Sequence, residues 1–191
     1  MARPIAAYLF LLATLVVGSA ALNALYRAHA DRMKLETGQA EWIWYTRQIS
    51  EPRPLHFYAT GGFELDSAPT RALAKVFVDR SHVLYVNGAR VGSGVQKPGH
   101  PLALYDLSRL LRAGSNRIAI EAASPTGIGG ILFALDLEGF GRDAFVSNGL
   151  WRVDLERSAI ASGARFRAQV WGRPPQYPWG YPRMPRPNEV R

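Results

Sequence analysis

The sequence predicts an all-β body, folded as a β-sandwich, behind a single N-terminal transmembrane helix. From residue 41 onward, short segments of apolar period two recur every 8–15 residues or so and are separated by turn residues, a spacing typical of a sandwich or barrel. No repeated βα unit appears among them. In front of them stands an uncharged apolar run from Ile5 to Leu25. These patterns divide the 191-residue chain into a membrane segment and one domain.

Composition excludes several classes of site. The chain contains no cysteine, which excludes disulfide frameworks, thiolate metal sites and cysteine nucleophiles. The net charge is +8, and most of the excess of basic residues lies near the C-terminus. Residues 163–191 carry six arginines and one acidic residue, Glu189, whereas residues 27–162 carry 16 basic and 14 acidic side chains. A nucleic-acid-binding domain spreads its basic residues over a groove or a recognition helix, so we expect no nucleic-acid partner.

The apolar run predicts a signal anchor over residues 1–26. A helix from Ile5 to Leu25 spans about 30 Å, the thickness of the hydrocarbon core of a bilayer. A removed signal peptide is the alternative, because small-residue cleavage sites occur at Gly18–Ala20 and Ala28–Ala30. We expect the protein in the inner membrane with its C-terminal domain on the extracytoplasmic, periplasmic side, although the count of basic residues around the span slightly favours the opposite orientation.

Residues 27–40 are polar and compatible with a helix, so they are predicted to form a stalk. The sandwich is predicted over residues 41–172, and its first half contains these candidate strands: Glu41–Tyr45, His56–Asp66, Ala72–Asp79, His82–Val86 and Ala89–Gly92. Asn87-Gly88 joins the last two as a predicted hairpin, because a type I′ turn needs positive φ at both central residues.

Local patterns make further structural predictions. In the first strand, period two places Trp42 and Trp44 on one face and Ile43 on the other. The pair Gly61-Gly62 predicts a bulge or a tight bend in the second strand. Asp106–Arg112 predicts one short helix. The remaining candidate strands are Asn116–Ala122, Ile131–Leu137, Phe145–Val153 and Arg165–Trp171.

Several of these segments, taken in order, resemble a known family. Val83–Gly92 is similar to the YVNGxxVG hairpin of galactose-binding-like jelly-roll domains, and Tyr105–Ile120 resembles the stretch that follows it there. Trp42–Trp44 and Ser147–Val153 fall where these domains carry WIW and Trp-Arg-Val elements. An arginine that they often carry is absent, because Tyr58–Phe63 stands in its strand. Such domains occur as sugar-binding domains of family-two glycoside hydrolases and as N-terminal domains of bacterial α-L-rhamnosidases.

The resemblance covers residues 41–172 and implies a jelly-roll β-sandwich. It also implies an accessory role beside a catalytic domain and, in some relatives, carbohydrate binding. A glycosidase needs two carboxylates facing each other across a cleft, and the acidic residues here are scattered through or beside strands. The motifs of serine hydrolases, zinc proteases and P-loop proteins are absent. We therefore expect a binding protein with no catalytic residues, no cofactor and no metal site.

Sugar binding calls for an exposed aromatic platform with polar groups nearby. The candidate ligand-binding residues are three aromatic and three polar side chains: Trp42, Trp44, Trp151, Arg90, His100 and Asn148. The tryptophans also have a structural interpretation, since we expect at least one of Trp42 and Trp44 to pack into the core, and Trp151 belongs to a motif that defines the fold.

Residues 173–191 form a tail rich in proline, arginine and aromatic residues. Its proline density excludes helix and sheet pairing and favours extended chain. Disordered segments are ordinarily poor in aromatic residues, so we expect the tail to dock, either on its own sandwich or on a partner protein or anionic lipid headgroups. The candidate docking residues are Tyr177, Trp179, Tyr181, Arg183 and Arg186.

Two functions are compatible with these features. The first is a membrane-anchored extracytoplasmic module that contacts envelope carbohydrate through its jelly roll. The second is an accessory structural subunit of a larger membrane protein complex, docked through its transmembrane helix, sandwich and tail. A glycan-array signal would favour the first function, and stable co-purification with a membrane complex would favour the second.

Overall fold

The computed structural model describes residues 8, 12–25, 36–47 and 52–189. The chain forms two units, residues 1–35 and residues 36–191, and each is described by itself. In the first unit, residues 12–25 are helical. In the part of the chain that the structure describes, no helix combines the length and apolarity needed to cross a bilayer. The predicted anchor over residues 1–26 lies partly outside the described residues, as does the predicted stalk over residues 27–40.

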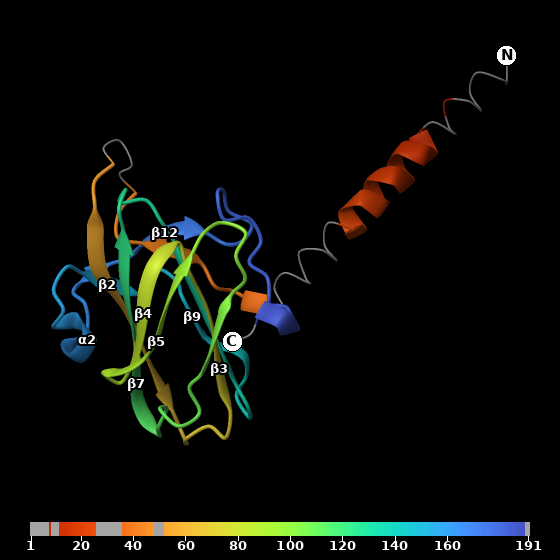
Figure 1. The fold of residues 1–191 in the computed structure, drawn as a ribbon. Coiled ribbons are helices and arrows are strands. Elements are labelled where there is room, and N and C mark those ends of the chain that lie inside the picture. The colour runs from red at the N-terminus through yellow and green to blue at the C-terminus, as the bar shows by residue number, and fades with distance from the viewer. Residues whose placement is uncertain (1–7, 9–11, 26–35, 48–51, 190–191) are drawn as a thin grey trace, which may run out of the picture. The chain divides into compact units, whose positions relative to one another are not determined.

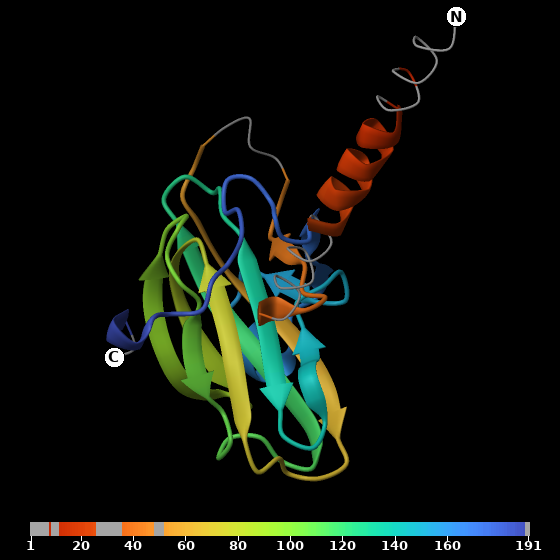
Figure 2. The ribbon, with the colours of Figure 1, turned by 90° about the vertical axis from the view of Figure 1, so that its right-hand side faces the viewer.

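The second unit is an all-β sandwich of two antiparallel sheets, as predicted (Figures 1 and 2). Sheet A has the order β12-β1-β8-β3-β6, with β9 paired to β8, and sheet B has the order β11-β10-β2-β7-β4-β5. The strands are β1 (Trp42–Trp44), β2 (Leu55–Leu65), β3 (Ala72–Val78), β4 (Arg80–Val86), β5 (Ala89–Gln96), β6 (Ala103–Asp106), β7 (Gly114–Ser124), β8 (Ile131–Leu137), β9 (Gly141–Val146), β10 (Arg152–Asp154), β11 (Phe166–Arg167) and β12 (Gln169–Gly172).

The main core lies between the two sheets, where alternate residues of both sheets meet. Val76 and Val78 of β3, Phe133 of β8 and Leu84 of β4 are fully buried there. Figure 2 turns sheet A toward the viewer, with sheet B behind it. The predicted hairpin of β4 and β5 is confirmed, since Asn87 and Gly88 both have positive φ. Burial of these alternating residues explains why the period-two pattern located the strands.

The outer face of sheet A is covered by the C-terminal tail. A second apolar cluster there joins Trp42, Phe77 and Leu132 of the sheet to Trp179 of the tail. The same face carries Lys75, which is 2% exposed and pairs with Asp136 at 2.9 Å and Asp143 at 3.1 Å. The tail thus completes a third layer of packing over this part of the sandwich.

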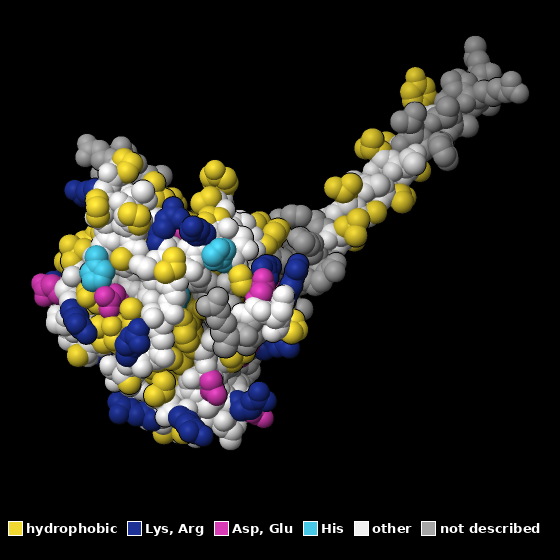
Figure 3. All heavy atoms as spheres, viewed as in Figure 1, with side chains coloured by type: hydrophobic (Ala, Val, Ile, Leu, Met, Phe, Trp, Pro, Cys, Tyr) yellow, Lys and Arg dark blue, Asp and Glu magenta, His cyan; other side chains and the backbone are white. Residues whose placement is uncertain are grey.

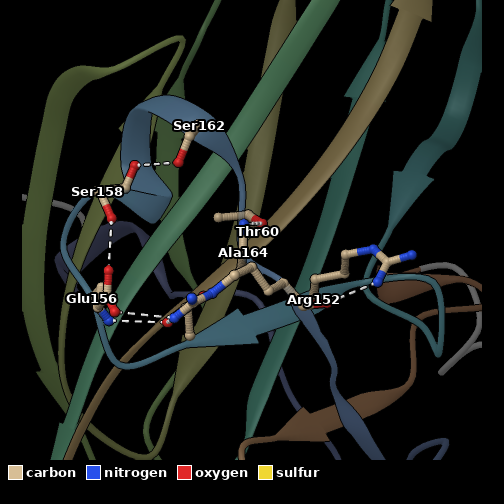
Figure 4. A network of polar contacts seen from close by, with 8 residues as sticks. Thr60, Arg152, Glu156, Ser158, Ser162 and Ala164 are labelled. Carbon is tan, nitrogen blue, oxygen red and sulfur yellow. Dashed lines mark hydrogen bonds and ion pairs between the residues drawn. The ribbon is translucent and has the colours of Figure 1, made fainter.

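The outer face of sheet B is covered by α2 (Ala159–Ser162), a short helix that the sequence did not predict. Figure 4 shows the polar network that fastens this segment to the sheet. Arg165 donates to the Asp154 carboxylate at 2.6 and 3.1 Å and to Glu156 at 3.1 Å, and the Ala164 amide donates to Thr60 Oγ1 at 2.9 Å. Hydrogen bonding from Arg165 lowers the pKa of Asp154 to about 2. These bonds let α2 cover the apolar residues of the sheet beneath it.

Three local predictions were wrong. The segment Asp106–Arg112 is the end of β6 followed by a hydrogen-bonded turn, in which the Leu110 and Leu111 amides both donate to the Leu107 carbonyl. Phe145–Val153 is divided between β9 and β10, and Arg165–Trp171 between β11 and β12, because these segments pass from one sheet to the other. Hydrophobic period alone does not mark such a transfer.

The glycine pair Gly61-Gly62 is neither a bulge nor a bend. β2 pairs with β7 in continuous register from Leu55 to Leu65. A Cβ at position 61 would lie 2.6 Å from the Trp151 ring and 2.7 Å from the Phe145 ring. Glycine is therefore required for close packing of these two rings, not for a change in strand direction.

The bulge lies in β1 instead. The register with β12 shifts between Trp42 and Ile43, so Ile43 and Trp44 both enter the main core while Trp42 turns to the outer face of sheet A. The prediction that Trp42 and Trp44 share a face was therefore wrong. A bulge puts two residues opposite one on the partner strand and breaks the period-two rule.

Candidate functional site

A pocket opens where the edge strands β5 and β6 of the two sheets meet the tail. Its volume is about 740 Å³. Polar lining residues are His82, Ser93, Gln96, His100, Tyr105, Arg183, Asn188 and Glu189, and apolar ones include Val95, Pro101, Leu104 and Pro185. We call this space the edge pocket. It has a mixed polar and apolar lining and the volume of an ordinary small-molecule site.

His82 and Tyr105 both line the edge pocket and join the two sheets. His82 of β4 lies 2.9 Å through Nε2 from the Tyr105 hydroxyl of β6. Two glycines of β5 make room for these rings. A Cβ at Gly94 would lie 2.9 Å from His82 Cε1, and one at Gly92 would lie 2.5 Å from Tyr105 Cε1. The glycines of β5 are thus what allows two rings to pack beneath that strand.

The imidazole of His82 is buried, with 3% of the residue exposed. Burial lowers the pKa of His82 to about 4, because the charged form loses its hydration. The ring is therefore neutral at pH 7. Its Nδ1 atom is buried and makes no hydrogen bond with the described residues. A nitrogen without a hydrogen bond is costly in an interior, and this one belongs to a residue that lines the edge pocket.

The tail supplies the opposite wall of the edge pocket. The Arg183 guanidinium donates to both carboxylate oxygens of Glu189, at 2.8 and 2.9 Å, within the turn that ends at η1 (Pro187–Glu189). These hydrogen bonds lower the pKa of Glu189 to about 2. The Leu102 amide donates to the Arg183 carbonyl at 2.8 Å and ties this wall to the β5–β6 connection. The charges of the wall are mutually compensated at neutral pH.

The three tryptophans predicted to bind a ligand do not reach the surface. Trp42 is 0% exposed and Trp44 and Trp151 are each 1% exposed. Their indole nitrogens are also turned inward, with Trp44 Nε1 donating to the Gly127 carbonyl and Trp151 Nε1 to the Val146 carbonyl. These predictions were wrong because the rings fill the cores on both faces of sheet A and offer no open platform.

The polar candidates are divided by the structure. His100 lines the edge pocket. Arg90 lies beside it, donating at 2.9 Å to the hydroxyl of Ser93, which is a lining residue. Asn148 is elsewhere, where its Oδ1 accepts a hydrogen bond from the Leu150 amide in the turn before β10. Of the three, Asn148 has a structural role in that turn and is not part of the pocket.

The tail docks on its own sandwich, which was one of the two predicted outcomes. Trp179 is only 6% exposed and packs against sheet A, which agrees with docking on the sandwich. Tyr177 is 90% exposed and Tyr181 is 36% exposed. Arg183 lines the edge pocket, and the Arg186 amide donates to Glu189 at 2.8 Å. Of the predicted tail residues, Trp179 is thus buried, Arg183 lines the edge pocket, and Tyr177 is exposed at the surface.

Sequence reasoning missed His82, Tyr105, Asn188 and Glu189. One signal for His82 was available, since period two puts it on the same face of β4 as Leu84 and Val86, and a polar residue on a core face is unusual. Nothing local brings β5, β6 and the tail together. Figure 3 shows basic side chains scattered over the face it displays, with apolar side chains between them. Elsewhere in the described part of the chain, no three histidine or acidic residues gather as a metal site would require.

No protein-family model matches the chain, and no curated protein matches it. Among solved structures, it is similar to an α-L-rhamnosidase of Streptomyces avermitilis, complexed with L-rhamnose, with a TM-score of 0.65 and 19% identity over 76% of this chain and 16% of that chain. A rhamnosidase of Bacillus sp. GL1 gives a TM-score of 0.65 and 21% identity, over 77% of this chain and 20% of that one. A lectin from Pleurotus ostreatus, in complex with GalNAc, gives a TM-score of 0.65 and 18% identity, over 79% of this chain and 48% of the lectin chain.

These likenesses confirm the predicted fold, a jelly-roll β-sandwich. At 18–21% identity they concern the fold alone. The chain spans less than half the length of each of these proteins. Any activity of the whole proteins is therefore a separate question from the architecture that this chain shares with part of them.

Proposed function

We propose that this protein is a non-catalytic carbohydrate-binding module and that the edge pocket is its binding site. The observation that carries the proposal is the pocket itself, in which hydrogen-bonding side chains from both sheets and from the tail converge on one space of about 740 Å³. Small-molecule sites of this size combine an apolar lining with a few placed polar groups. The fold supports the same class of ligand, because the similar structures include a lectin bound to GalNAc.

The electrostatics of the edge pocket favour a neutral sugar. Arg183 and Glu189 neutralise each other, and His82 is uncharged at pH 7. Sugar hydroxyls both donate and accept hydrogen bonds, so they can use a carboxylate, a guanidinium, an amide and an imidazole in one site. The rings and prolines among the lining residues provide surface for the apolar side of a sugar.

The proposal includes the predicted location, with the module anchored in the inner membrane and the sandwich outside the cytoplasm. The uncharged run Ile5–Leu25 supports it. Protease added to intact spheroplasts should then digest the sandwich, whereas digestion only after lysis would place it in the cytoplasm. The second candidate function, an accessory subunit, would replace the first if the full chain co-purified with a membrane complex and bound no glycan.

The direct test is a glycan array with the full chain, followed by calorimetric titration of the best ligand. His100→Ala and Asn188→Ala each remove a polar group that lines the pocket, and each should weaken binding about tenfold, the effect of losing a hydrogen bond worth about 1–2 kcal/mol. His56→Ala makes the same chemical change as His100→Ala on another part of the molecule, beside Glu121, and should leave affinity unchanged. No array signal, or equal binding by all variants, would refute the proposal.

A further inference from the structure

The tail is attached to the sandwich by a buried tryptophan. Trp179 stacks on Trp42 with ring centroids 4.6 Å apart and an interplanar angle of 26°, and it meets Trp171 edge-on at 6.3 Å. Its Nε1 donates to Asp79 Oδ2 at 2.8 Å, and that carboxylate is also buried. A stacked, buried indole with a charged hydrogen-bond acceptor is a strong point of attachment.

The site that receives Trp179 is built into the sheet. The bulge in β1 turns Trp42 outward to form one wall, and Gly130, the residue before β8, leaves the space for the Trp179 ring. A Cβ at position 130 would lie 2.8 Å from Trp179 Cζ2 and 2.9 Å from Trp42 Cε3. The outward side chain of Trp42 and the missing side chain at Gly130 therefore together make room for the Trp179 ring. We call this site the indole nest.

Beyond the indole nest, the tail becomes the wall of the edge pocket. Residues Arg183, Pro185, Asn188 and Glu189 line the pocket within ten residues of Trp179. In the described part of the chain, this segment is hydrogen-bonded to the rest of its unit by the Leu102 amide, which donates to the Arg183 carbonyl at 2.8 Å, and by a bond between Glu36 and the Met184 backbone. The Arg183–Glu189 pair lies within the tail itself and does not attach it. Within residues 173–189, Trp179 and Pro182 are the buried residues, and Trp179 has by far the larger side chain.

We infer that Trp179 is the positioning residue of the binding site, holding the tail wall of the edge pocket in place through the indole nest without touching the ligand. The inference rests on the proposed function and names the element on which that function depends. The ligand contacts the tail wall of the pocket. Trp179 holds that wall in place, and Asp79 and Trp42 hold Trp179.

The test uses Trp179→Ala in the full chain together with free indole. The variant should bind the glycan at least tenfold more weakly than the wild type. Added indole should occupy the indole nest and raise the melting temperature of the variant toward that of the wild type. It should not restore glycan binding, because free indole is not covalently linked to the tail residues that line the pocket. Trp179→Phe keeps a stacked ring and should recover much of the affinity. Recovery of binding with free indole, or unchanged affinity of Trp179→Ala, would overturn the inference.

A second variant keeps the test decisive if Trp179→Ala does not fold. Ending the chain after Pro182 keeps Trp179 and removes the wall, so it should preserve the melting temperature and lose glycan binding to the same extent. Unchanged binding by this variant would also overturn the inference. If the wild type binds no glycan, the proposed function fails. The role of Trp179 in holding the tail is then tested by trypsin cleavage after Arg183, which should be faster in Trp179→Ala than in the wild type. Equal cleavage rates would show that Trp179 does not hold the tail in place.

Discussion

Acidification should destabilise this protein through His82, beginning below about pH 6.5. The ordinary pKa of histidine is 6.5 and burial lowers that of His82 to about 4. Between these values the unfolded chain takes up a proton that the folded protein refuses, so the unfolded state binds more protons and the free energy of unfolding falls as pH decreases. The stability that His82 contributes is complete above pH 6.5 and is lost on the way down to about pH 4.

The size of the effect follows from the shift in pKa. A shift of one unit corresponds to about 1.4 kcal/mol, so the loss is ~2 kcal/mol between pH 7.5 and pH 5 and ~3 kcal/mol when titration is complete. Urea unfolding followed by tryptophan fluorescence at several pH values measures it directly. The buried tryptophans, Trp42 and Trp44 among them, make fluorescence a sensitive probe of the sandwich.

His82→Gln provides the control, because its side chain does not titrate while the other histidines and the acids titrate in both proteins. The variant should be less stable at pH 7.5, since the bond to the Tyr105 hydroxyl is altered, but its stability should change much less between pH 7.5 and pH 5. The same pH dependence in wild type and variant would show that His82 is not the group responsible, and the argument from its burial would fail.

Two further substitutions test the packing and the buried charge. Gly61→Ala should lower the free energy of unfolding by about 2 kcal/mol in urea titrations, because the new Cβ would lie 2.6 Å from the Trp151 ring. Gly62→Ala, whose Cβ would meet its nearest neighbour at 3.6 Å, is the matched control, and equal losses would contradict the packing argument. Lys75→Met should cost about 3 kcal/mol by the same assay, since it leaves Asp136 and a second aspartate without their buried cation. An unchanged unfolding midpoint would mean that this charge cluster contributes nothing.

Local sequence pattern predicted most of the strands because at least one face of the longer strands, such as β3, β4 and β7, is buried. Asn87-Gly88 located its hairpin for an equally local reason, the backbone conformation that a two-residue turn demands. The failures have non-local causes. Gly61 is explained by rings from β9 and the turn before β10, and the direction of Trp42 depends on how β1 pairs with β12. Neither cause can be read from the residues that surround these positions.

The candidate site was predicted only in part for the same reason. His100 and Arg183 were singled out as polar residues of a loop and of the tail, and both line the edge pocket. Their position next to each other depends on contacts between a sheet edge and the end of the chain. His82 and Tyr105 were missed because their pairing joins two different sheets, so neither strand reveals the other.

The pairing of β1 with β12 has a kinetic consequence. Trp42 lies opposite Gly172, about 130 residues further along the chain, and closing so long a loop costs much entropy before any contact rewards it. Hairpins such as that of β4 and β5 close loops of a few residues only. Refolding should therefore assemble the hairpin-connected strands of the core first and pair β1 with β12 last. Because the tail follows β12 along the chain, its docking should be the final and slowest event in a time course.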